Sequence, residues 1–98
     1  MHTVLWSYRV VPGREAEFEA LYRGDGDWAE LFRRDPAYLG TELLRDTTDS
    51  SRYLTIDRWH SRAAYEAFLG SATTAYAALD RRGDAVTLEE TRLGAIDD

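Results

Sequence analysis

Cysteine is missing from this chain, and so are lysine, asparagine and glutamine. Without cysteine the protein has no disulfide framework, no thiol nucleophile and no cysteine-ligated zinc or iron–sulfur centre. A cysteine-free chain suits a reducing compartment, so we expect a cytoplasmic protein. The lack of asparagine also removes that amide side chain from any catalytic role.

Long apolar runs and clusters of basic residues are missing as well. No segment has the length and apolar character of a membrane span, and the first residues lack the basic-then-apolar pattern of a secretory signal. The net charge is −6, and the twelve arginines are scattered along the chain. Because phosphate binding needs a positive stripe, nucleic acid is not an expected partner.

Sequence patterns for metals and cofactors are also absent. His2 and His60 lie far apart in the chain and have no patterned carboxylate beside them, so they do not indicate a metal site. There is no glycine-rich phosphate loop, no G-x-S-x-G turn and no dinucleotide fingerprint. The sequence therefore predicts a protein that uses no metal and no cofactor.

The chain does have apolar and aromatic residues in quantity. It has 98 residues, 44% of them hydrophobic, with three tryptophans, six tyrosines and three phenylalanines. This composition argues against disorder, and the length leaves no room for two cores. We therefore expect one globular domain over residues 1–98.

The segment from Arg52 to Leu69 has the clearest change of period. Up to Trp59 the side chains alternate, as in a strand; after Ser61, a good helix N-cap, the apolar residues recur at helical spacing. Trp59 should therefore lie where a sheet meets a covering helix, which is where we expect any pocket. By the same two periods, strands are expected at 3–11, 38–46, 52–59 and 85–93, and helices at 14–22, 27–35 and 62–82.

Polar residues and glycines mark the expected helix ends. Asp27 and Glu30 have the spacing of a capping box at the start of the short helix. Ser71 is expected to recap the long helix after a break at Gly70, and Gly83 to follow that helix in the C′ position. The acidic tail of the chain is expected to be frayed.

The order of these elements, β-α-β-β-α-β, predicts the ferredoxin-like α+β fold. Its four-stranded antiparallel sheet has both helical units on one face. The other face still carries apolar side chains, among them Leu5, Val11, Leu54 and Ile56. Because an exposed apolar face usually has a partner, we expect a homodimer that pairs sheet face to sheet face.

Three stretches of the sequence together resemble one known family. They are YRVVPGREAEFEALY, DPAYLGTELLRD and RYLTIDRWHSRAAYEAFL, and the last contains the run W-x-S-x-x-A-Y-x-x-F. In these stretches the chain resembles the antibiotic biosynthesis monooxygenase-like family of dimeric α+β barrel proteins. The resemblance implies a homodimer whose two sheets form a barrel, with a pocket between sheet and helices in each subunit. It also implies the oxidation of phenolic or anthrone-type molecules with O₂, without metal or flavin.

The resemblance extends to single positions. The family's monooxygenases have a tryptophan at the end of the third strand and a tyrosine early in the next helix, which correspond to Trp59 and Tyr65. The family's asparagine four residues before the tryptophan corresponds to Thr55. The polar and ligating positions of the haem-degrading branch correspond to Trp6, Phe68 and Ala78. None of these three side chains can take those roles, so haem degradation is not expected.

The candidate catalytic residues are Trp59, Tyr65, His60 and Asp57. Trp59 could stack on a planar substrate or close the core, and Tyr65 could donate its phenol proton to a substrate oxygen or pack. His60 and Asp57 are candidate proton acceptors; a solvated loop histidine and an arginine-paired or solvated aspartate are the alternatives. Candidate substrate-binding residues, which could equally be core residues, are Trp6, Tyr8, Phe68 and Tyr76.

Three functions fit this sequence. The first is a cofactor-independent monooxygenase acting on a planar phenolic, anthrone or quinol-like small molecule. The second is a non-catalytic small-molecule-binding dimer whose pocket is filled by its own aromatic side chains, and the third is a cyclase or isomerase that needs no O₂. Oxygen dependence separates the first from the third, and a cavity below about 300 Å³ would favour the second.

Overall fold

The computed structural model describes residues 1–98, and four segments of alternating side chains form one antiparallel sheet. These segments are β1 (His2–Val10), β2 (Tyr38–Arg45), β3 (Arg52–Trp59) and β4 (Thr87–Asp97). β1 pairs with both β3 and β4, while β2 pairs with β3, so the strand order is β2-β3-β1-β4. The ferredoxin-like α+β prediction is confirmed.

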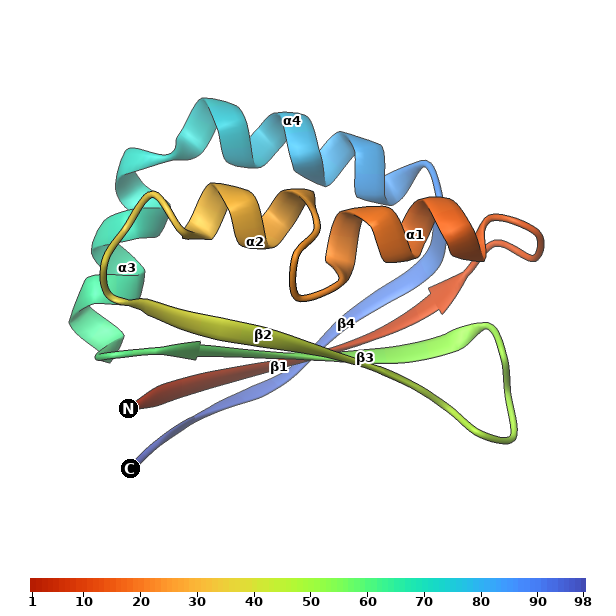
Figure 1. Ribbon diagram of the computed structural model, residues 1–98, viewed down its shortest axis with the longest axis horizontal. Coiled ribbons are helices and arrows are strands. Elements are labelled where there is room, and N and C mark those ends of the chain that lie inside the picture. The colour runs from red at the N-terminus through yellow and green to blue at the C-terminus, as the bar shows by residue number, and fades with distance from the viewer.

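Four helices cover one face of this sheet (Figure 1). They are α1 (Glu15–Tyr22), α2 (Asp27–Phe32), α3 (Arg62–Ser71) and α4 (Thr73–Asp84). The N-cap prediction for Ser61 is confirmed, because its hydroxyl oxygen accepts the Ala64 backbone N–H at 3.1 Å. None of the helices is both long and apolar enough to cross a membrane.

The strand register sorts the side chains onto two faces, because residues directly opposite each other in a sheet share a face. Trp6 lies opposite Thr55 and Tyr8 opposite Tyr53, on the face that the helices cover. Leu5 lies opposite Ile56 on the other face. The alternation predicted for β1 and β3 is thus confirmed, and the second face remains free of helices (Figure 1).

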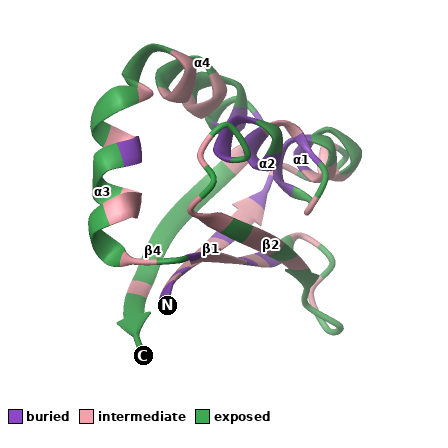
Figure 2. Cartoon of the chain, turned by 60° about the vertical axis from the view of Figure 1, so that its left-hand side comes forward, coloured by how far each residue is buried: buried purple, intermediate pink, exposed green.

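The core lies between the helices and their sheet face, where the buried residues gather (Figure 2). Trp59, fully buried at the end of β3, is central to it. The distance from the ring centroid of Trp59 is 5.4 Å to that of Phe32, 5.2 Å to that of Phe68 and 5.3 Å to that of Tyr38. Such tilted and edge-to-face contacts are the favoured geometries of aromatic side chains, so aromatic packing stabilises this junction of sheet and helix.

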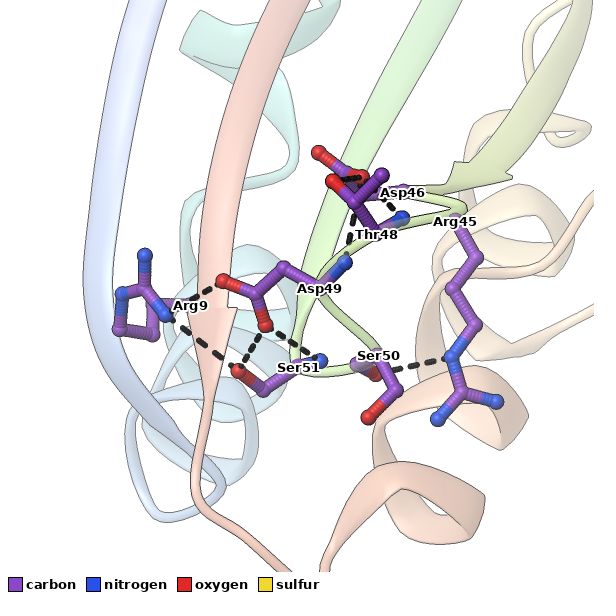
Figure 3. Close-up of polar contacts among 7 residues, drawn as sticks. All are labelled: Arg9, Arg45, Asp46, Thr48, Asp49, Ser50 and Ser51. Atoms are coloured by element: carbon purple, nitrogen blue, oxygen red, sulfur yellow. Dashed lines mark hydrogen bonds and ion pairs between the residues drawn. The ribbon is translucent and has the colours of Figure 1, made fainter.

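Aspartate side chains shape the turn between β2 and β3 (Figure 3). Asp46 Oδ1 accepts the Thr48 backbone N–H at 2.7 Å, and Asp49 Oδ1 accepts the Ser51 hydroxyl at 2.8 Å. Arg9 Nη1 donates to Asp49 Oδ2 at 2.9 Å, which ties the turn to β1. Short side-chain to backbone bonds of this kind replace ladder bonds in a turn and so fix the hairpin register.

Three predicted helix ends are wrong. Gly26 occupies the N-cap position of α2 and provides no side-chain hydrogen bond, so Asp27 is the first residue of the helix rather than its cap. The Asp27 carboxylate instead forms an ion pair with Arg82 at 2.7 Å. The break between α3 and α4 falls at Ala72, and the Ser71 hydroxyl donates back to the Phe68 carbonyl instead of capping α4. Gly83 lies inside α4, where its missing side chain makes room for Tyr22.

The frayed tail is also a wrong prediction. β4 begins at Thr87, two residues later than expected, and continues to Asp97 along β1. His2 is buried, and its Nδ1 lies 2.5 Å from Asp97 Oδ1. The ladder with β1 and this polar contact hold the tail in the sheet.

Candidate functional site

A cavity of about 30 Å³ lies between the sheet and the helices. Side chains from the sheet that line it are Trp6, Tyr8, Thr41, Thr55, Asp57 and Glu90. Side chains from the helices that line it are Tyr22, Trp28, Phe32, Tyr65, Leu69 and Tyr76. The wall is thus mainly aromatic, and its polar groups are two carboxylates, two threonine hydroxyls and the hydroxyls of its tyrosines.

Asp57 is the polar group at the centre of the sheet wall. It lies opposite Thr41 of β2, and the Thr41 hydroxyl donates to its Oδ1 at 2.5 Å. The Tyr38 hydroxyl lies 2.5 Å from the same Thr41 oxygen, so a hydrogen-bonded row runs from Tyr38 through Thr41 to the carboxylate. No arginine pairs with Asp57, and burial raises its pKa to about 6, although the Thr41 bond opposes the shift.

The tyrosines of the cavity differ in their hydrogen bonding. Tyr8 Oη lies 3.1 Å from Thr55 Oγ1, so each of these buried hydroxyls satisfies the other. Tyr65, from α3, has no protein partner for its hydroxyl, and burial raises its pKa. Burial also raises the pKa of Tyr76 to about 12. The phenols of Tyr8, Tyr65 and Tyr76 therefore stay protonated at neutral pH, and Tyr65 has its O–H available to donate to a ligand.

A second carboxylate, Glu90, reaches the cavity from β4. Burial and the nearby carboxylates of Asp80 and Asp84 raise its pKa to about 7. No arginine forms an ion pair with it. The cavity therefore has carboxyl groups on two different strands, each shifted towards the range in which it can exchange protons near neutral pH.

The structure brings together five of the eight residues that the sequence singled out: Trp6, Tyr8, Asp57, Tyr65 and Tyr76. Trp59 and Phe68 lie behind this wall, and Trp59 is fully buried, so it presents no ring face to the cavity. His60 is exposed in the turn between β3 and α3 and does not line the cavity.

Sequence reasoning missed the neighbours that complete the wall. Thr41 lies in β2 and meets Asp57 only through the β2–β3 register, which no local pattern gives. Trp28 and Phe32 are four residues apart in α2 and both buried, and this apolar helical spacing was the available signal for them. Glu90 belongs to a strand whose polar residues alternate weakly, so the sequence gives no signal for its direction.

The chain is similar to several solved structures and matches one family. The family model described as antibiotic biosynthesis monooxygenase matches residues 1–78. SnoaB, a cofactor-independent oxygenase from Streptomyces nogalater, is 23% identical with a TM-score of 0.81, covering 99% of this chain and 91% of its own. PA3566 from Pseudomonas aeruginosa is 22% identical with a TM-score of 0.68, and the similarity covers 99% of this chain and 92% of the PA3566 chain. No curated protein matches the chain.

The solved structures share the fold, while the family match rests on the sequence itself. It spans β1 through the first turns of α4, and includes Asp57 and Tyr65 together with the helix N-cap at Ser61. The match covers well over half of the chain. The protein is therefore a member of the antibiotic biosynthesis monooxygenase family.

Proposed function

We propose that this protein is a cofactor-independent monooxygenase that oxidises a planar, acidic aromatic molecule of the anthrone or quinol type with O₂. The observation that carries the proposal is Asp57, a carboxylate without a cationic partner, in an aromatic cavity, with its pKa raised to about 6. A base of that strength accepts a proton near neutral pH. SnoaB, whose fold this chain shares, is described as a cofactor-independent oxygenase, which supports the same function.

The chemistry requires only a proton acceptor, a dry pocket and O₂. With an anthrone, Asp57 removes a proton from the acidic ring CH₂ of the substrate, and the resulting anion transfers an electron to O₂. Recombination forms a carbon–oxygen bond and a peroxide, which takes a proton and then loses water to leave a carbonyl. One CH₂ group and one O₂ thus become one C=O and one water, and Asp57 ends the cycle ionised.

The neighbouring residues support this chemistry in different ways. Tyr65 has a free hydroxyl that can donate to the substrate oxygen and stabilise the anion. Trp6, Tyr8 and Tyr76 offer apolar ring surface for a flat molecule and exclude water. Asp57 is a better candidate base than His60, because His60 is exposed outside the cavity wall.

The cavity volume favours a second candidate function. A volume of about 30 Å³ holds one or two waters, whereas ligand sites measure roughly 300 Å³ or more. A protein whose pocket is filled by its own aromatics fits the non-catalytic binding function. Oxidation of an anthrone requires α3 to move outward with Tyr65 and Leu69. Phe68 is the only buried residue of α3, and the backbone leaves the helical conformation at Ala72 (φ −101°, ψ 27°), so few buried contacts oppose that motion.

Oxygen uptake by the purified protein tests the proposal. The wild type, Asp57→Asn, Tyr65→Phe and His60→Ala are measured against a panel of anthrones and hydroquinols. We expect uptake by the wild type and His60→Ala, a loss of about 10²-fold or more in Asp57→Asn, and a smaller loss in Tyr65→Phe. Binding of the panel without uptake favours the non-catalytic protein, and product formation without uptake favours the cyclase or isomerase.

We also infer a homodimer that pairs the uncovered sheet faces of two copies, as the family resemblance implies. Leu44, Leu93 and Ile96 are exposed on that side of the sheet or at its edge, and Leu5 lies beside Ile56 at its centre. This pairing involves the uncovered face of the sheet, whereas the cavity lies on the face that the helices cover. The cytoplasmic location remains a prediction of the cysteine-free sequence.

A further inference from the structure

Tyr38 and Thr41 lie on the same face of β2, although they are three positions apart in the chain. In a regular strand the side chains alternate, so two residues at this spacing point to opposite faces. In this protein Tyr38 lies opposite Trp59 and Thr41 lies opposite Asp57. Trp59 and Asp57 are both on the face that the helices cover, so both β2 hydroxyls belong to that face as well.

A β-bulge produces this arrangement. The register of β2 against β3 shifts between Tyr38 and Gly40, which leaves Leu39 as an extra residue without an opposite partner. Gly40 has a φ of +147°, a conformation that residues with a side chain rarely adopt, and Leu39 is 54% exposed. Bulges re-aim side chains and are frequent beside functional sites. Here the bulge brings two hydroxyl groups of one strand to the same side as Asp57.

The hydrogen bonds of these two hydroxyls have a defined direction. Thr41 donates its single hydroxyl proton to Asp57 Oδ1 at 2.5 Å. The Tyr38 hydroxyl lies 2.5 Å from the same threonine oxygen, so Tyr38 is the donor of that second bond. Hydrogen bonds in such a row polarise one another, which makes Thr41 a stronger donor to the carboxylate. The row therefore favours an ionised Asp57 with Oδ1 held in place.

Only one of the two carboxylate oxygens of Asp57 is held in this way. The bond from Thr41 is the one hydrogen bond that the Asp57 side chain forms with the protein. Oδ2 therefore has no protein partner, and the side chain lines the aromatic cavity. Because Oδ1 already accepts from Thr41, a proton taken from a bound molecule can go to Oδ2 without any rearrangement of the row.

We propose that Thr41 and Tyr38 are positioning residues, which fix the Asp57 carboxylate through Oδ1 and so make Oδ2 the oxygen that accepts the substrate proton. The inference rests on the proposed oxygenase function, in which Asp57 is the base. A carboxylate without this bond rotates over a broad range about its Cβ–Cγ bond, and few of its orientations direct a lone pair at the substrate. Fixing it beforehand removes that loss from the barrier of the proton transfer.

The titration of Asp57 tests the row without any substrate. The carboxyl carbon-13 NMR signal of Asp57, identified by its loss in Asp57→Asn, is followed against pH. Valine has the shape of threonine without the hydroxyl, so in Thr41→Val the ionised carboxylate loses its donor. The midpoint of the Asp57 titration should then move up by about one pH unit. Tyr38→Phe should give a smaller upward change, and Thr41→Ser, which keeps a hydroxyl, should stay close to the wild type.

Oxygen uptake with the anthrone panel tests the assignment of Oδ2. At a pH well above these midpoints Asp57 is ionised in every variant, so a difference in rate reports its orientation rather than its charge. We expect Thr41→Val to lower kcat about tenfold or more with little change in KM, and Thr41→Ser to restore most of the rate. The acidic limb of the pH profile should move up together with the Asp57 titration.

Thr48→Val is the matched control. The Thr48 hydroxyl also donates to an aspartate, Asp46 Oδ1 at 2.8 Å, but in the exposed turn between β2 and β3 (Figure 3). This variant should leave both the Asp57 titration and the oxygen uptake unchanged.

The two measurements distinguish failure of this inference from failure of the proposed function. An unchanged Asp57 midpoint in Thr41→Val would overturn the row, and full wild-type uptake by that variant at high pH would overturn the assignment of Oδ2. A change in Thr48→Val as large as that in Thr41→Val would mean a general effect of losing a hydroxyl and would also overturn the inference. A shifted Asp57 midpoint in Thr41→Val, without uptake by the wild type, would confirm the row and overturn the oxygenase function together with the role of Oδ2.

Discussion

At the scale of single residues, Asp57 combines a cost to stability with a chemical use. Its carboxylate lies in an aromatic wall and has one strong donor, the Thr41 hydroxyl at 2.5 Å. Burial disfavours the charged form, so its pKa in the folded protein is about 6, whereas an unfolded aspartate has a pKa of about 3.9. Between these values the folded protein holds a proton that the unfolded chain has already released.

The sign of the resulting pH dependence follows from that proton. Because the folded state binds more protons, stability falls as pH rises from about 4 to about 6, and the full penalty of at most about 3 kcal/mol applies above that window. Asp57→Asn keeps an oxygen that can accept from Thr41 and removes the charge. We therefore expect it to be more stable than the wild type at pH 8 by roughly 1–3 kcal/mol, and equally stable near pH 4.

Urea unfolding of both proteins across pH 4–8 measures this difference. Glu30→Gln is the matched control, because Glu30 is an exposed acid on α2 whose side chain forms no hydrogen bond or ion pair. Its effect on the free energy of unfolding should be small. A variant at Asp57 that is less stable than the wild type at pH 8 would mean that the ionised carboxylate stabilises the fold.

The sequence indicated part of this site because strand alternation determines side-chain direction. It correctly put Asp57, Thr55 and Trp59 on one face of β3. It could not give Thr41 as the partner, because that contact depends on the β2–β3 register and on a register shift next to Gly40. Nor could it separate a fully buried Trp59 from one that borders a cavity, since both satisfy the same pattern.

At the scale of the elements, the contact between α1 and α4 depends on one missing side chain. Gly83 lies inside α4 and packs against the Tyr22 ring. Alanine in a helix interior normally stabilises relative to glycine by about 0.5–1 kcal/mol. At Gly83 the added Cβ would instead overlap the buried Tyr22 hydroxyl and approach Cζ to 3.2 Å, so one of the two helices must shift.

Gly83→Ala and Gly70→Ala form a matched pair. Gly83→Ala should lower the free energy of unfolding by about 1–3 kcal/mol through overpacking. Gly70, which lies in α3, has open space around its Cβ position, so Gly70→Ala should raise it by about 0.5–1 kcal/mol. Denaturant unfolding checks both values.

The double variant with Tyr22→Phe tests the cause of the expected loss. Removing the hydroxyl oxygen removes the closest contact of the new methyl group, so part of the lost stability should return. Equal stabilisation by the two alanines would mean that α4 can move away from Tyr22 at no cost.

The order and type of the elements were predictable, and several of their ends were not. Period and turn residues indicated every strand and helix. The chain end after Leu93 has no marked alternation, but pairing with β1 makes it a strand as far as Asp97. Gly83 resembled a helix end because glycine is common there, whereas its actual role is to permit a close approach from a distant helix.

At the scale of the whole molecule, the sheet has one covered and one uncovered face. On the uncovered face Leu44 lies opposite Leu54, and Leu5 opposite Ile56. Leu93 is 54% exposed on the edge strand β4. Arg58 pairs with Glu42 at 2.9 Å on the same face, which gives the apolar centre a charged border. An apolar centre with a polar rim is the usual composition of a protein interface.

A second copy is the partner that this face fits under the proposed dimer, because a two-fold pairing repeats each apolar residue across the interface. We expect light scattering after size exclusion to give the mass of two chains. The double variant Leu44→Glu/Leu93→Glu adds charge on both edge strands, so it should give the mass of one chain while keeping its helical circular dichroism. Ala77→Glu, which adds charge at an exposed position on α4, should remain dimeric.

A single-chain mass for the wild type at high micromolar concentration would contradict the barrel. A dimer that survives the double variant would place the interface on the helical side, where it would cover α3 and obstruct the motion that the cavity needs to admit a substrate.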